Sequence, residues 1–185
     1  MKKVSESLVR ARVPLSWALG LAGLLLARPT AVSYTVGLMV AAVGEIGRVW
    51  AAGYLVKWKG LTRNGPYAWT RNPLYLGSLI VGIGFAVATA RWELGLLLVV
   101  FLLLVYVPVI KTEAARLAET YPEAYAEYAR EVPLFLPRPP KKTAANEDSF
   151  SWQRVLENRE HVTLLGWFGT ALLLWLRMRG VGALG

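Results

Sequence analysis

The chain has 185 residues, of which 55% are hydrophobic, and its mean hydropathy of +0.40 is too high for an ordinary soluble domain of this length. It carries a formal charge of +9, no cysteine and one histidine. This composition excludes a disulfide framework, a cysteine nucleophile and a cysteine-based metal site, and one histidine cannot form a histidine-rich metal site.

Long uncharged runs predict membrane-spanning helices. Each is close to the roughly 17–25 residues that cross a bilayer as a helix. The first run follows a basic start and also resembles a signal peptide, but "LLARPTA" is a poor cleavage site, which favours a retained helix. The runs are Val13–Ala27, Ala31–Gly44, Leu74–Ala90, Leu94–Ile110 and Val162–Leu176. We therefore expect an all-α fold, a polytopic membrane bundle of about five transmembrane helices.

The positive residues are distributed unevenly when these spans are threaded through a bilayer. The N-terminal segment and the loops after the second and fourth spans carry most of them, and the other side carries only Arg28, Arg91, Arg177 and Arg179. Cytoplasmic loops of membrane proteins show this bias. The charge therefore predicts a multi-pass protein of the inner or plasma membrane with a cytoplasmic N-terminus, in contact with the lipid bilayer, and it does not require nucleic acid as a partner.

The polar segments set the expected domain organisation. Short connections at 28–30 and 91–93 predict antiparallel helical hairpins, whereas the longer segments on the other side predict a small cytoplasmic helical cap. Residues 1–137 should form the membrane core and its cap, with spans near 13–27, 31–56, 73–90 and 93–110. Residues 138–151 should be a flexible connector, and 152–185 an interfacial segment followed by the fifth span.

Charged residues within or beside these apolar runs are candidates for chemistry. Glu45 and Arg48 lie three positions apart, on one face of the second helix, where they can pair either as a structural ion pair or as a functional group. Glu113 lies about one turn past Pro108, where the helix can bend. Its carboxylate is either partly desolvated and able to handle protons, or a solvated partner of nearby basic residues.

The stretch GPYAWTRNPLYLG, residues 65–77, interrupts the hydrophobic pattern. Its prolines remove backbone donors, and irregular backbone at membrane depth is tolerated only where protein buries it or where it lines a cavity. Its aromatic rings, the Arg71 guanidinium and the Asn72 amide are suited to a pocket for a flat, charged ligand. They are equally suited to an interfacial belt that anchors the third helix.

An ordered set of motifs resembles the isoprenylcysteine carboxyl methyltransferase family and its phospholipid methyltransferase relatives. The set comprises GPY at 65–67, RNPLYLG at 71–77, Glu113, YPEAYAEY at 121–128 and Val132-Pro133, so that the resemblance covers residues 31–137. It implies an integral membrane enzyme that moves a methyl group from S-adenosylmethionine to a lipophilic acceptor. The acceptor would be a lipid amine or the carboxylate of an isoprenylcysteine-like compound, methylated on nitrogen or oxygen.

The resemblance also implies the residues of the site, and it implies no metal. Glu113 and Arg71 are the expected catalytic residues: Glu113 would accept a proton or balance an ammonium, and Arg71 would bind an anionic group. The expected cofactor contacts are Lys59, Gly60, Leu61, Thr62, Tyr67, Asn72, Pro73, Leu74, Tyr75, Tyr125 and Tyr128. The last two would help to close a lid over the cofactor.

Two departures from the family pattern bear on the substrate. The family usually has His where this chain has Asn72, which can hydrogen-bond a ligand but cannot carry a proton near neutral pH. Eukaryotic members also place an arginine shortly before the glutamate, whereas this chain reads Pro108-Val109-Ile110-Lys111. The second departure favours a lipid amine over a prenylcysteine carboxylate as the acceptor.

Two other functions fit the same sequence. Membrane reductases of the sterol-reductase type share a similar basic and aromatic neighbourhood and bind NADPH, although they generally have more spans. A non-catalytic membrane scaffold could also have kept the fold.

Overall fold

A computed structural model describes residues 14–16, 18–56, 60–140 and 149–180. Every regular element in these ranges is helical, which confirms the expected all-α class. The elements are a short apolar helix Pro14–Leu26, then α2 (Ala31–Tyr54), η1 (Gly65–Ala68), α3 (Pro73–Ala88), α4 (Trp92–Phe101), η2 (Leu102–Tyr106), α5 (Val107–Thr120), α6 (Pro122–Glu131), α7 (Trp152–Glu157) and α8 (Glu160–Met178).

Within the described residues, three helices are long and apolar enough to cross a membrane. They are α2, the continuous helix Trp92–Thr120 and α8. The other two expected spans, Pro14–Leu26 and α3, are apolar but shorter. The chain is thus an integral membrane protein by its helices, while the number of five spans and the cytoplasmic side of the cap stay predictions.

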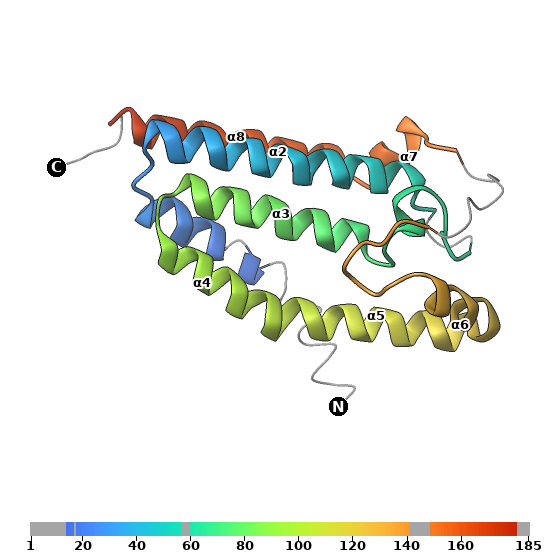
Figure 1. Ribbon diagram of the computed structural model, residues 1–185. Helices are drawn as coiled ribbons and strands as arrows, with labels where there is room; N and C mark the ends of the chain where they lie inside the picture. The colour runs from blue at the N-terminus through green and yellow to red at the C-terminus, as the bar shows by residue number, and fades with distance from the viewer. Residues whose placement is uncertain (1–13, 17, 57–59, 141–148, 181–185) are drawn as a thin grey trace.

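Glycines bring α2 and α3 into direct backbone contact. A Cβ added at Gly44 would lie 2.7 Å from the Gly77 carbonyl oxygen, and one added at Gly84 would overlap the Ala41 backbone. Small residues allow such close approach in membranes, where van der Waals packing drives helix association. The two helices therefore lie side by side along their length (Figure 1).

The helix that contains α4 and α5 is continuous but changes its winding in the middle. Residues 102–106, labelled η2, form a π-helical turn just before Pro108. Proline lacks an N–H and its ring crowds the carbonyl four residues earlier, and a π turn is one way for a helix to absorb that misfit. The expected irregularity near Pro108 is therefore present, on its N-terminal side.

The C-terminal elements fold back onto α2 (Figure 1). Asn158, at the end of α7, donates its side-chain amide to the carbonyls of Ala52 and Leu55 at 2.9 and 3.0 Å, which satisfies the C-terminal end of α2. Arg159 then adopts a left-handed conformation, with φ +60°, and α8 begins at the next residue. At the far end of α8, Arg177 donates to the Ala27 carbonyl at 2.7 Å.

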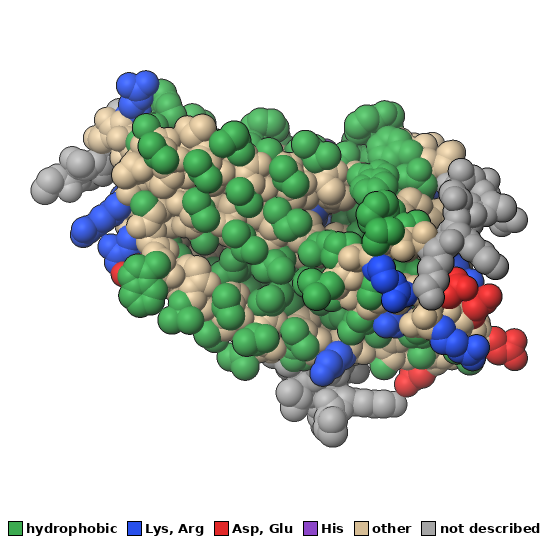
Figure 2. All heavy atoms as spheres, viewed as in Figure 1, with side chains coloured by type: hydrophobic (Ala, Val, Ile, Leu, Met, Phe, Trp, Pro, Cys, Tyr) green, Lys and Arg blue, Asp and Glu red, His purple; other side chains and the backbone are tan. Residues whose placement is uncertain are grey.

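The surface matches a membrane setting. Figure 2 shows hydrophobic side chains spread over the broad face of the bundle, with charged side chains gathered toward its two ends. Exposed apolar residues occur on α2, α4 and α8, among them Val43, Ile46, Leu96, Leu165 and Phe168. A lipid-facing surface accounts for so many exposed apolar side chains, which a soluble protein of this size would bury.

Candidate functional site

The irregular stretch before α3 is held by the segment that follows α6. The Arg71 N–H donates to the Pro133 carbonyl at 3.0 Å, and the Arg138 N–H donates to the Trp69 carbonyl at 3.0 Å. The buried Thr70 hydroxyl donates to the Phe135 carbonyl at 2.9 Å. Residues 69–72 and 133–138 thus satisfy one another's backbone groups, so that the irregular backbone is buried in protein.

A glycine turn starts this stretch. Gly65 has φ +58°, and a Cβ there would lie 2.7 Å from the Tyr54 ring at the end of α2. A side chain would therefore meet both an unfavourable backbone conformation and the Tyr54 ring. Pro66 follows within η1, where its missing N–H costs little, and the turn leads the chain from α2 toward α3.

Tyr75 and Glu113 form the polar centre of the candidate site. The Tyr75 hydroxyl on α3 donates to Glu113 Oε1 on α5 at 2.7 Å. The Tyr106 ring, from the π turn, packs edge-on against the Tyr75 ring with centroids 5.3 Å apart. Glu113, an expected catalytic residue, is therefore hydrogen-bonded to Tyr75, an expected cofactor contact.

Arg71 is oriented by α6. Its Nη1 donates to the Tyr125 hydroxyl at 2.8 Å, and its Cζ lies 5.4 Å from the centroid of the Tyr125 ring. Its Nε is buried and has no hydrogen-bond partner among the described residues. The guanidinium is thus fixed on one side and retains a buried donor that suits a carboxylate or another anionic group.

Tyr67 and Tyr128 lie in the core of the cap. The Tyr128 hydroxyl donates to the Tyr67 carbonyl at 2.7 Å, and the Tyr128 side chain packs with Tyr125 and Val132. Burial raises the pKa of both phenols well above the usual value near 10. Both phenols therefore stay protonated over the physiological range, and Tyr128 fixes α6 over the stretch before α3.

The Asn72 side chain links the start of α3 to the segment that follows α6 by a hydrogen bond. Its Nδ2 donates to the Leu134 carbonyl at 2.8 Å, and its backbone N–H donates to the Thr70 hydroxyl at 3.3 Å. The residue immediately precedes α3 and provides no side-chain cap for it. The amide therefore binds the segment after α6 to the start of the helix.

The structure places most of the remaining predicted residues around these contacts. Leu61 packs against the Tyr125 and Tyr128 cluster, and the buried Thr62 accepts a hydrogen bond from the Val56 N–H at 3.2 Å. Pro73 is buried in the first turn of α3, and the Leu74 carbonyl accepts from Arg48. Gly60 is exposed with φ +128°, and Lys59 lies outside the described residues.

A cavity of about 290 Å³ lies among the Pro14–Leu26 helix, α3, α4 and α8, and it is also lined by Tyr106, whose ring packs against Tyr75 of the polar centre. Its walls are mostly apolar, with Gly20, Gly23 and Leu24 on one side and Val81, Gly82 and Phe85 on another. Ser78 and Tyr106 line the end nearest Tyr75. Neither Tyr106 nor Ser78 was among the residues predicted from the sequence. A polar or aromatic residue within an aliphatic run was the available signal.

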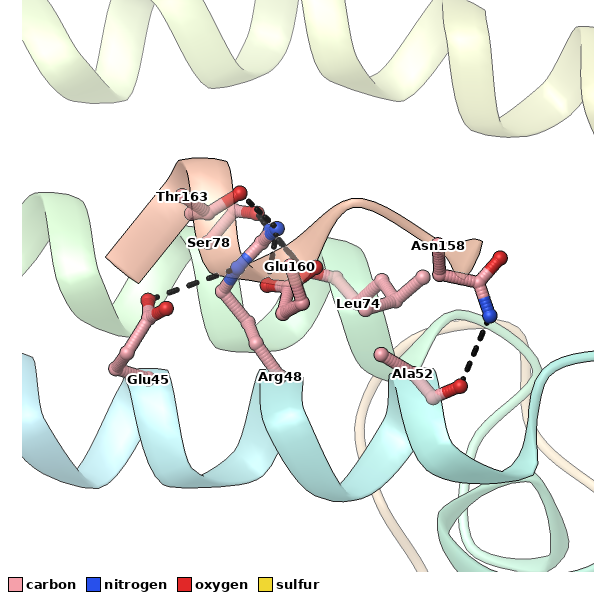
Figure 3. A network of polar contacts seen from close by, with 8 residues as sticks. All are labelled: Glu45, Arg48, Ala52, Leu74, Ser78, Asn158, Glu160 and Thr163. Atoms are coloured by element: carbon pink, nitrogen blue, oxygen red, sulfur yellow. Dashed lines mark hydrogen bonds and ion pairs between the residues drawn. The ribbon is translucent and has the colours of Figure 1, made fainter. Parts of the chain in front are cut away.

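Arg48 connects three helices inside the bundle (Figure 3). The expected pair with Glu45 is present, with Nε 3.7 Å from Oε2, but the shorter contact joins Nη2 to Glu160 Oε1 at 2.6 Å. Both carboxylates are buried. Glu160 was not among the predicted partners, because nothing in the spacing relates the start of the last span to the second helix.

Comparison with known proteins identifies relatives of this chain. Residues 18–124 match the model of the family described as phospholipid methyltransferase. The cobalt-zinc-cadmium resistance protein CzcN of Cupriavidus metallidurans is 37% identical over 106 residues, which are 56% of this chain and 49% of that protein. The nickel-cobalt-cadmium resistance protein NccN of Alcaligenes xylosoxydans xylosoxydans is 34% identical with the same coverage.

These matches have defined limits. The chain spans about half the length of the curated relatives it matches. No solved structure matches it. In the part of the chain that the structure describes, no three His, Cys, Asp or Glu side chains are grouped as they would be to hold a metal ion. The family match covers Tyr75, Glu113 and the beginning of α6, but not the end of α6 or α8.

Proposed function

The chain belongs to the phospholipid methyltransferase family, and from this premise we propose that it transfers a methyl group from S-adenosylmethionine to a lipophilic acceptor in the membrane. The observation that carries the proposal is the 2.7 Å hydrogen bond between Tyr75 and Glu113. It joins the start of α3 to α5 beside an apolar cavity within the bundle. Tyr106, which lines the cavity and packs against Tyr75, connects this polar group with a space suited to a hydrocarbon chain.

The side chains around Arg71 fit S-adenosylmethionine. The unpartnered Arg71 Nε suits the carboxylate of its amino-acid part, and the partly exposed Tyr75 ring supplies aromatic surface near the start of α3. The buried Tyr67, Tyr125 and Tyr128 rings are proposed to lie behind this surface in the cap. Residues 59–62 and Asn72–Leu74 complete the proposed set. When bound, the cofactor supplies an electrophilic methyl group, so the protein has to orient the acceptor and exclude water.

Glu113 is proposed to prepare the acceptor. A protonated lipid amine cannot act as a nucleophile until it loses a proton, and a carboxylate in contact with the headgroup can accept that proton. The lone pair of the nitrogen then becomes available. Tyr75 donates to Oε1 and so fixes the direction in which the carboxylate faces. An acceptor carboxylate would need a cation instead, and Arg71 could serve it only in place of the cofactor carboxylate proposed above.

The cavity is the proposed place of the acceptor's chain. Its apolar walls, from the Pro14–Leu26 helix, α3 and α4, match a hydrocarbon, and the end lined by Tyr106 is the one that adjoins Tyr75. The acceptor would therefore reach the site from within the bilayer. The names of the metal-resistance relatives state no reaction, and we carry over no metal-binding role from them.

Labelling of lipids by the purified full chain tests the proposal. The protein is incubated with methyl-labelled S-adenosylmethionine and a lipid extract of its own host, and we expect the label in a lipid. Glu113→Gln should lower the rate by about 100-fold or more, since it removes the proton acceptor. Glu119→Gln changes an exposed glutamate of the same helix and is the matched control.

Cofactor titrations separate the alternatives. We expect S-adenosylhomocysteine to bind, and to bind Glu113→Gln as well. Binding of NADPH alone would instead favour a membrane reductase, and binding of neither would favour a scaffold. Label found only in protein would refute a lipid acceptor, and full activity of Glu113→Gln would refute the role of that carboxylate.

A further inference from the structure

We propose that Glu160, the first residue of α8, is a positioning residue for this site, acting through Arg48 on the first turns of α3. The inference rests on the proposed function and concerns a helix that lies beyond the family match at 18–124. In this proposal, α8 contributes a residue on which the geometry of the methyl-transfer site depends. The chain of contacts runs from Glu160 to Arg48, then to Leu74 and Ser78, and so to Tyr75.

The Arg48 side chain crosses α3 at Gly77. A Cβ added at Gly77 would lie 2.5 Å from Arg48 Cγ, so the side chain passes over α3 only because residue 77 is glycine. Beyond that point Arg48 Nη1 donates to the Leu74 carbonyl at 3.4 Å and to the Ser78 hydroxyl. Ser78 itself donates to the Leu74 carbonyl at 2.8 Å.

Glu160 holds the Arg48 guanidinium beside Leu74 and Ser78. Glu160 Oε1 lies 2.6 Å from Arg48 Nη2, whereas the nearest Glu45 oxygen lies 3.7 Å from Arg48 Nε. Thr163, one turn further along α8, accepts from Nη2 at 3.4 Å. These groups lie between helices in an apolar region, so removing Glu160 would leave the half-buried guanidinium with only the longer ion pair.

The backbone that leads into Glu160 is anchored to α2. Asn158 caps the end of α2, Arg154 Nε donates to the Gly53 carbonyl at 2.9 Å, and the left-handed Arg159 turns the chain directly into α8. Figure 3 shows Glu160 and Thr163 on α8 facing Arg48 on α2, with Leu74 and Ser78 of α3 beside them. A carboxylate anchored in this way can hold the Arg48 guanidinium at one position through the ion pair.

The consequence reaches the polar centre along one helix. Leu74 and Ser78 flank Tyr75 on α3, and the Tyr75 hydroxyl must lie within hydrogen-bond distance of Glu113 on α5. A displacement of about 1 Å in a catalytic site can reduce the rate about 100-fold. Glu160 therefore controls the reaction without touching the substrate or the cofactor.

The test compares Glu160→Ala with Arg177→Leu in the full chain. Both remove a polar tie between α8 and the rest of the bundle, but Arg177 acts at the opposite end, on the Ala27 and Leu25 carbonyls. We expect Glu160→Ala to lower kcat by roughly 10- to 100-fold, with the acceptor KM nearly unchanged. Arg177→Leu should leave kcat within about twofold of the wild type even if it lowers the thermal stability.

Hydrogen exchange supplies a readout that does not depend on activity. Backbone amides of 74–80 should exchange about tenfold faster in Glu160→Ala than in the wild type, and no faster in Arg177→Leu. Glu160→Gln keeps an acceptor oxygen for Arg48, so the amides of 74–80 should exchange at an intermediate rate in this variant. It replaces the alanine variant in the test if Glu160→Ala does not fold. Wild-type exchange at 74–80 in the glutamine and alanine variants, or equal acceleration in Arg177→Leu, would overturn the inference.

The two proposals fail separately. If the wild-type protein transfers no methyl group, the proposed function fails, while the exchange of 74–80 still decides whether Glu160 positions α3. If the wild-type protein is active and the exchange and kcat of Glu160→Ala equal those of the wild type, only the positioning role fails.

Discussion

Asn72 has a structural role in the site, set by the hydrogen bond of its side-chain amide. Asn72 stands where the family resemblance led us to expect histidine, and the structure engages its amide with the Leu134 carbonyl at 2.8 Å. An amide can make that bond at any pH, whereas histidine would change its hydrogen-bonding with protonation. At this position the chain therefore has a pH-independent tie between α3 and the segment after α6.

Tyr128 carries a prediction at the residue scale. Phe in its place should lower the stability of the cap by about 1–2 kcal/mol at neutral pH, because the buried Tyr67 carbonyl loses its donor. The loss can be measured as faster limited proteolysis of α6 in detergent. Tyr121→Phe is the control, since its ring packs against the same cluster.

The same residue predicts a pH dependence of stability. Burial raises the folded pKa of Tyr67 and Tyr128 above the unfolded value near 10. The unfolded chain then loses these protons first, so the stabilisation is complete below pH 10 and is lost as the pH rises through the folded pKa. Tyr128→Phe removes one of the two phenols and should fall less steeply above pH 10. An equally steep fall would contradict this account.

At the scale of elements, the contact between α2 and α3 positions the site. Gly37 and Gly44 face Gly84 and Gly77, and each lacks the Cβ that would strike the other helix. Close packing at Gly37 and Gly77 was not predicted, although Gly77 ends the RNPLYLG motif. Small residues are recognisable in a sequence, but their pairing depends on how two helices are rotated toward each other.

Gly84→Ala tests this contact. The added methyl group would overlap the Ala41 backbone and force α2 and α3 apart, with an expected destabilisation of about 1–3 kcal/mol. Thermal unfolding in detergent measures it. Gly169→Ala, on α8, adds the same atom where nothing lies within 4 Å and should not lower the midpoint. Equal midpoints for the two variants would show that the close approach is absent.

The π turn is a second feature at this scale. Pro108 predicted an irregular helix, and the structure adds that the π turn ends at Tyr106, whose ring packs against Tyr75. Such turns are frequently found at functional sites. Here the turn connects the wall of the cavity with the polar centre.

For the whole molecule, the cavity among four helices is the feature that would select an acceptor. Gly20 lines it and has open space around its Cβ position. Leucine at this position would fill part of the 290 Å³. We expect Gly20→Leu to reduce turnover of long-chain acceptors by roughly tenfold and that of short-chain analogues little, since lost apolar contacts scale with chain length.

A matched control distinguishes cavity filling from general damage. Gly47→Leu adds the same side chain on α2, where nothing lies within 4 Å and which is not part of the cavity wall. It should leave the chain-length preference unchanged. If both variants lose activity equally with long and short acceptors, the cavity does not hold the chain.

The class of protein and its helical elements could be predicted from the sequence. Long apolar runs must form helices in a bilayer because every backbone group has to be hydrogen-bonded within the segment, and this is a local property. The ordered motifs likewise predicted the family and placed Tyr75 and Glu113 in one neighbourhood. The number of spans is harder to count, because α3 covers only 16 residues.

The partners of the buried polar groups were decided by the tertiary structure alone. A charged residue in an apolar run has to find a partner, but the sequence does not say on which helix that partner lies. The fold sets Glu160 against Arg48, the Leu134 carbonyl against Asn72 and Tyr106 against Tyr75. Each contact depends on how segments distant in the chain are rotated and packed, and neither composition nor spacing records that rotation.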